Sequence, residues 1–162
     1  MSKSKRIVMG ILCLLSICVI GMPVFKYLGT TPLSLFNQKS VPWIKTVLVI
    51  GDAGVTILKI MFGGLIILQA IALLSIILKK GKMAKFWNVI AGLYETVNAL
   101  LILTYILHLI GKINDFIGIT ILDEKAGAGV YAMIFLGIAQ VIFAIMDKQK
   151  KSGDIFDILT GK

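Results

Sequence analysis

The residue with the clearest chemical potential is Glu95, a carboxylate in the middle of a long apolar run. The run covers residues 86–110, and Glu95 is its only formally charged member. In a helix that begins with the run, Glu95 lies about 13–15 Å deep, near the centre of a hydrocarbon layer about 30 Å thick. An ionised group at that depth costs several kcal/mol unless it is protonated, paired or wetted. Glu95 is therefore either a packing group between helices or a working site.

Polar residues also occur at a similar depth in the other apolar runs of the chain. Ser16, Gln69 and Gln140 each lie eight to ten residues from the basic residues that flank their run. Glu95 lies ten residues from its own flanking lysine, so all four groups are expected about 12–15 Å deep. Asn98 lies one helical turn beyond Glu95. We therefore predict an intramembrane polar cluster of Ser16, Gln69, Glu95, Asn98 and Gln140.

The helix that carries Glu95 has a polar and small-residue stripe, while its other faces are rich in Leu, Ile and Val. Positions three and four residues apart make up this stripe, and we expect it to face other helices because polar groups avoid lipid. The members of the stripe are Asn88, Ala91, Glu95, Asn98, Ile102 and Tyr105.

Three roles for this polar cluster remain open at this point. Interhelical hydrogen bonds from Gln, Asn and Ser commonly hold membrane helices together, at about 0.6–2 kcal/mol each. The cluster could instead form a pathway for protons, ions or substrate, or contact a helix of a partner. Packing is the preferred interpretation. No cation in the apolar interior matches Glu95, so we expect it to be protonated at rest.

The overall composition predicts an integral membrane protein. The chain is 58% hydrophobic and 15% charged, with a mean hydropathy of +0.96, which is too apolar for a soluble domain. Four apolar runs are long enough to cross a bilayer, at residues 7–24, 56–78, 86–110 and 127–146. We predict an all-α membrane protein, a four-transmembrane-helix antiparallel bundle that forms one domain over residues 1–162.

The distribution of charge predicts the topology and argues against nucleic-acid binding. The net charge is +9, and 11 of the 17 basic residues lie before the first run, between the second and third, or after the fourth. Four spans place these three segments on one side of the membrane. The positive-inside rule then predicts a multi-pass cell-membrane protein with both termini in the cytoplasm. These basic segments could also attract anionic lipid head groups.

Two segments are predicted to lie outside the membrane, at residues 25–55 and 111–126. The first is long and too apolar for a disordered loop. We predict a small extracytoplasmic cap that includes strands, with an interfacial helix at residues 41–50 as the rival interpretation. The strand-forming segments are 33–36, 46–50 and 116–122, and residues 51–54 are expected to form a turn.

Catalytic and metal-binding patterns are missing from the sequence. There is no P-loop, no dinucleotide-binding glycine motif, no nucleophile motif and no pair of intramembrane aspartates. Cys13 and Cys18 fall some 140° apart on one helix, at about 100° per residue, so they should not form a disulfide. A metal ion at His108 would need further ligands, and the only carboxylates nearby in the sequence are Asp115, Asp123 and Glu124. We therefore predict a protein that is not an enzyme and has no cofactor and no metal.

The loop lengths resemble those of claudin-type tetraspan proteins: a long first outer loop, a tight inner turn and a shorter second outer loop. The claudin loop signature of Trp, Gly-Leu-Trp and two cysteines is absent, and Trp43 is the only tryptophan in the loops. The resemblance therefore implies a layout and no family.

The sequence predicts a small bacterial protein, because 16 Lys against one Arg and abundant Ile suit an AT-rich genome. We predict an accessory or interaction subunit that binds another membrane or envelope component through its outer loops. The alternative is a small transporter or channel subunit that uses Glu95. The expected partners are the lipid bilayer and a second membrane protein or another copy of the chain.

Overall fold

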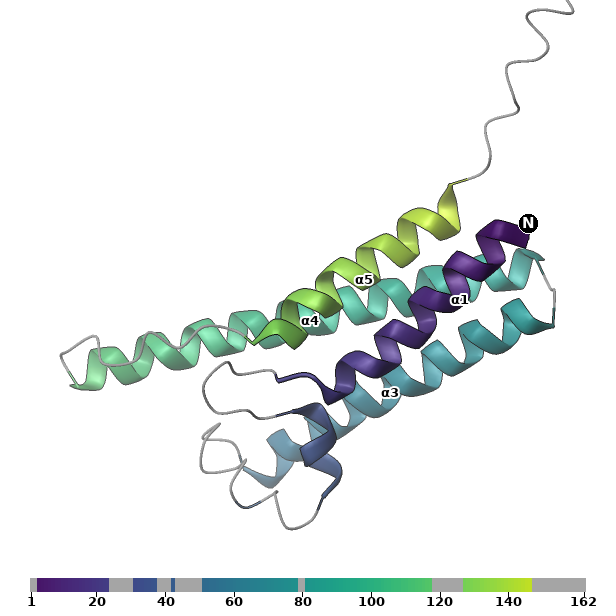
Figure 1. Ribbon diagram of the computed structural model, residues 1–162. Coiled ribbons are helices and arrows are strands. Elements are labelled where there is room, and N and C mark those ends of the chain that lie inside the picture. Colours follow the sequence, from purple (N-terminus) through teal and green to yellow (C-terminus); the bar gives the residue numbers. More distant parts are fainter. Residues whose placement is uncertain are drawn as a thin grey trace, which may run out of the picture.

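The described part of the chain is helical throughout. The computed structural model describes residues 3–23, 31–37, 42, 51–78, 81–117 and 127–146. Four of its helices are long and apolar enough to cross a membrane, the first of them together with the short 3-10 helix that follows it. The elements, shown in Figure 1, are α1 (Lys3–Cys18), η1 (Val19–Gly21), η2 (Pro32–Phe36), α3 (Asp52–Ile77), α4 (Gly81–Ile117) and α5 (Ala128–Ile145).

The four long helices form an antiparallel bundle. Helix α1 packs against α3 and α5, and α4 packs against the same two helices, so α1 and α4 face each other across the bundle. Figure 1 shows the N-terminus, the end of α3, the start of α4 and the end of α5 at one end of the bundle. We call this the lysine-rich end, because Lys3, Lys82 and Lys85 lie there. The opposite end, with η1 and η2, is called the loop end.

The lysine-rich end is closed by a contact between the first and last helices. The Lys5 ammonium donates hydrogen bonds to the backbone carbonyls of Ala144 and Met146, at the end of α5. The carbonyls of a last helical turn have no partner inside their own helix, and a cation there also compensates the negative end of the helix dipole. Lys5 therefore joins α1 to α5 at this end.

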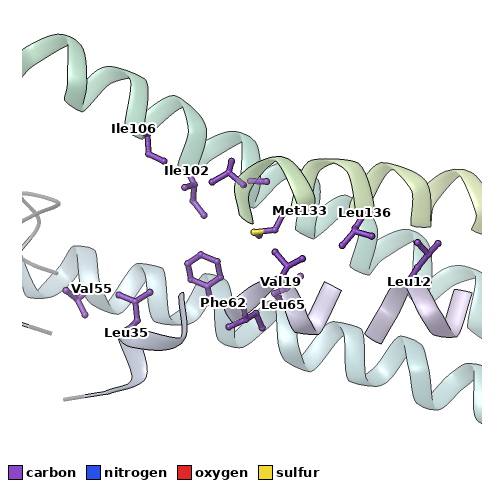
Figure 2. Close-up of a cluster of buried hydrophobic side chains, with 13 residues drawn as sticks. Leu12, Val19, Leu35, Val55, Phe62, Leu65, Ile102, Ile106, Met133 and Leu136 are labelled. Carbon is purple, nitrogen blue, oxygen red and sulfur yellow. The ribbon is translucent and has the colours of Figure 1, made fainter. Parts of the chain in front are cut away.

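The apolar interior has two parts with different side-chain sizes. Near the lysine-rich end lies a cluster of mostly small residues, which we call the lysine-end core. Towards the loop end lies a cluster of larger residues, the loop-end core, part of which is shown in Figure 2. The lysine-end core consists of Met9, Cys13, Ala72, Ile76, Ala84, Ala91 and Ala144. The loop-end core includes Val19, Leu35, Phe62, Leu65, Ile102, Ile106 and Met133.

The predicted strands are not found where the structure describes the chain. Residues 33–36 belong to the 3-10 helix η2, which begins at Pro32, and proline is well suited to a first helical position. Leu35 of η2 is buried in the loop-end core, so this part of the predicted cap folds onto the bundle. The segments 46–50 and 118–122 and the rival interfacial helix lie outside the described residues, apart from the helical Pro42.

Two further predictions of local structure are also wrong. Helix α3 begins at Asp52 after Gly51, so residues 51–54 start a helix where a turn was expected. Helix α4 continues to Ile117, so Phe116 and Ile117 of the predicted strand 116–122 are helical. The candidate span in α4 ends at Ile106. The following eleven residues extend the helix by about 16 Å, beyond the start of α5 in Figure 1.

Candidate functional site

The centre of the bundle is a pair of glutamines that hydrogen-bond each other across it. Gln69 on α3 donates from Nε2 to Gln140 Oε1 at 2.9 Å, and Gln140 on α5 donates from Nε2 to Gln69 Oε1 at 3.0 Å. Both side chains are fully buried. Since α3 and α5 are not neighbours in the bundle, this reciprocal amide pair joins two helices that pack mainly through others.

The glutamine pair extends to the other two helices on its lysine-rich side. Gln140 Nε2 also lies 2.9 Å from Asn88 Oδ1 on α4 and 3.3 Å from Cys13 Sγ on α1. The Cys13 thiol donates in turn to Asn88 Oδ1 at 3.3 Å. Asn88 is anchored by its own helix, because its Nδ2 donates to the Ala84 carbonyl at 2.7 Å. One connected network therefore includes a side chain from every long helix.

Glu95 joins the network through only one of its two carboxyl oxygens. Gln69 Nε2 donates to Glu95 Oε2 at 2.9 Å. The other oxygen, Oε1, is buried and has no hydrogen-bond partner. Ser16, on α1, brings its side chain to the Glu95 carboxyl. Ser16 Oγ nevertheless has no partner within hydrogen-bond geometry. Asn98 Nδ2, one turn further along α4, is also buried and unpartnered.

On α3 and α5 the polar residues lie between the two apolar cores. On α3, Gln69 lies between Ala72 of the lysine-end core and Leu65 of the loop-end core. On α5, Gln140 lies between Ala144 and Leu136 in the same way. The polar side chains therefore form one layer, here called the polar layer, with apolar packing on both sides. It consists of Cys13, Ser16, Gln69, Asn88, Glu95, Asn98 and Gln140.

The structure brings together the residues that the sequence singled out. Ser16, Gln69, Glu95, Asn98 and Gln140 are all buried in the polar layer. Hydrogen bonds join Gln69, Glu95 and Gln140, whereas Ser16 and Asn98 have polar atoms without a partner. The five residues therefore share one place in the fold, although their depth in a membrane and their role stay predictions.

Two members of the layer were missing from the predicted cluster. Asn88 lies on the predicted stripe, and its position two turns before Glu95 is a signal that could have included it. No sequence signal marks Cys13 as a hydrogen-bonding group. Of the remaining stripe residues, Ala91 and Ile102 are buried as expected, whereas Tyr105 is exposed.

The chemistry available to the polar layer is that of hydrogen bonding and of one carboxyl group. Among the described residues, no three of the types His, Cys, Asp and Glu come close enough to hold a metal ion. His108 is exposed on α4, away from the layer. Both cysteines are free, as predicted, with Cys13 buried and Cys18 exposed.

Fold and site together define an all-helical bundle of four helices, each long and apolar enough to cross a membrane, with a buried polar layer that joins all four. Comparison with protein-family models, curated protein sequences and solved structures gives no match for this chain.

Proposed function

We propose that this chain is a non-enzymatic multi-pass protein of a bacterial cell membrane that works as an accessory or interaction subunit. Its bundle serves as a fixed scaffold, and its loop end binds another membrane or envelope component. The observation that carries the proposal is the position of the polar layer between two apolar cores. A carboxyl group closed off in this way favours cohesion between helices over passage of a substrate.

Features of the loop end support its role as the binding end. Helix α4 extends about 16 Å past its candidate span, and η2 presents Leu33 and Phe36 on its exposed side. Exposed apolar side chains outside a membrane span are candidates for protein contacts. We infer that the component bound there is a membrane protein, either of another kind or a second copy of this chain.

The orientation in the membrane follows from the basic residues and is part of the proposal. We place both termini and the lysine-rich end in the cytoplasm. Single cysteines introduced into a chain without Cys13 and Cys18 test this. A membrane-impermeant thiol reagent added to intact cells should label Ser40→Cys and leave Gly81→Cys unlabelled until the cells are opened. Labelling of Gly81→Cys from outside would contradict the four-span topology.

A site-specific photo-crosslinker tests the binding end. Placed at Leu33, which is 61% exposed, it should give one defined protein adduct in intact cells. The matched control is Ile145, which is 64% exposed at the lysine-rich end of α5 and should give lipid adducts. Mass spectrometry of the adduct distinguishes a second copy of this chain from another protein. Lipid adducts alone at both positions would contradict the proposed interaction.

The second candidate function is a small transporter or channel subunit that uses Glu95. The observation in its favour is that the carboxyl oxygen Oε1 has no hydrogen-bond partner, and neither do Ser16 Oγ and Asn98 Nδ2. Such a function requires Glu95 to change its protonation or bind a cation. The conservative variant Glu95→Gln, which cannot titrate, separates this candidate from the scaffold.

A further inference from the structure

Three polar atoms on the loop-end side of the polar layer have no hydrogen-bond partner. They are Ser16 Oγ, Glu95 Oε1 and Asn98 Nδ2. Their side chains are 0%, 0% and 6% exposed, so bulk water does not reach them. Buried polar atoms in proteins are almost always paired, with protein or with an ordered water. An unpaired group at this position therefore points to a bound partner.

The three atoms belong to one small region. Asn98 lies three residues after Glu95 on α4, so the two side chains project from the same face of the helix. Ser16 comes from α1, which faces α4 across the bundle, and its side chain interacts with the Glu95 carboxyl. Towards the loop end, the interior continues into the apolar side chains of Val19, Phe62 and Ile102.

The chemistry of the three atoms limits the ligand. An amide NH₂ only donates a hydrogen bond, whereas the free oxygen of a neutral carboxyl group and a hydroxyl can each donate and accept. A metal cation is disfavoured beside the Asn98 donor, and an anion is disfavoured beside the carboxyl oxygen. A small neutral molecule that both donates and accepts suits all three.

We propose that Ser16, Glu95 and Asn98 bind one occluded water molecule. The water accepts from Asn98 Nδ2 and forms its other two hydrogen bonds with Glu95 Oε1 and Ser16 Oγ. Three hydrogen bonds are the usual number for a buried water. This water completes the polar layer on its loop-end side and adds a second link between α1 and α4, besides that of Cys13 with Asn88. This ligand is independent of the proposed binding partner.

Apolar substitutions distinguish a bridging water from truly unpaired atoms by the sign of their effect. If Ser16 Oγ and Asn98 Nδ2 had no partner, Ser16→Ala and Asn98→Leu would remove a buried polar penalty and raise the thermal midpoint of the purified full chain. If a water joins them, each variant removes one of the three groups that hold the water. The other two groups then lose their bridge, and the thermal midpoint falls by a few degrees. The double variant should then lose less than the sum, because both changes remove the same bridge.

A matched control and a direct readout complete the experiment. Ser75→Ala removes a buried hydroxyl that already bonds the Ala72 carbonyl at 2.7 Å, so it should leave the number of bound waters unchanged. Oxygen-17 relaxation dispersion of water should report one more long-lived water in the wild type and in Ser75→Ala than in the double variant. Equal numbers, or a higher midpoint in both single variants, would overturn the proposal.

A salt exchange on the unmodified chain tests the ion as the alternative ligand. The thermal midpoint should be the same in sodium chloride and in choline chloride at equal ionic strength. A higher midpoint with sodium alone would assign the three side chains to a cation and overturn the proposed water.

Discussion

Gly137→Ala is expected to lower the free energy of unfolding by about 1–3 kcal/mol, the usual cost of an extra carbon in a tightly packed interior. Gly137 of α5 packs tightly against Gly92 of α4. A Cβ at Gly137 would lie 2.7 Å from the Gly92 carbonyl oxygen and 3.0 Å from the Thr96 backbone nitrogen. Backbone atoms cannot move aside as a flexible side chain does, so the helices must separate.

Gly63→Ala on α3 is the matched control, because a Cβ at Gly63 meets nothing within 4 Å. Alanine is favoured over glycine inside a helix by about 0.5–1 kcal/mol, so this variant should be as stable as the wild type or slightly more stable. Unfolding of the purified protein in detergent, followed by circular dichroism, compares the two. Equal stability of the Gly137 and Gly63 variants would mean that the α4–α5 approach is looser than described.

Glu95→Leu is expected to lower the free energy of unfolding by about 1–2 kcal/mol, the scale of interhelical hydrogen bonds in membranes. Leucine fills a similar volume to glutamate but cannot accept a hydrogen bond. The substitution therefore removes Glu95 Oε2, to which Gln69 Nε2 donates at 2.9 Å. Glu95→Gln keeps an oxygen at that position and should unfold like the wild type. The same unfolding measurement checks both variants. If Glu95→Leu were more stable than the wild type, the Glu95 carboxyl group would not be holding the helices together.

The architecture was predictable because bilayer thickness imposes a simple length rule. The four apolar runs correctly predicted the four long helices, because a helix that spans a bilayer needs about 20 apolar residues. The ends were less predictable, because a helix can continue where the apolar run stops. Helix α4 covers 37 residues from Gly81 to Ile117, while the apolar run that predicted it covers residues 86–110.

The strand prediction for residues 33–36 failed for a different reason. The segment 33–36 is short and rich in large apolar residues, a composition that fits a buried helical turn as well as a strand. Pro32 and the burial of Leu35 in the loop-end core decide in favour of the 3-10 helix. Packing against the bundle, which is not visible in the sequence, determines the local structure here.

The composition of the polar layer could be predicted only in part. Counting residues from the basic ends put Gln69, Glu95 and Gln140 at one level, because all helices rise equally per residue. The same count missed Cys13, which enters the layer through the reach of the Gln140 side chain. It also could not show that the Glu95 carboxyl is bonded on one oxygen and unpartnered on the other.

As a scaffold, the four-helix bundle is expected to be rigid. Hydrogen bonds that cross both diagonals of the bundle favour motion of the four helices as one unit. The small residues of the lysine-end core bring the helices close together on one side of the polar layer, and the Gly92–Gly137 contact does so between Leu136 and Gln140 of α5. We expect a partner at the loop end to meet a rigid surface, with the recognition residues carried by η2 and the end of α4.

The central claim is that Glu95 acts as a hydrogen-bonding group and does not titrate during function. Complementation by Glu95→Gln in a strain that lacks the natural gene tests it most directly, with the thermal midpoint of the purified variant as a check of folding. We predict that Glu95→Gln complements fully and melts like the wild type. A variant that folds with a normal midpoint but fails to complement would contradict the scaffold interpretation and favour the transporter.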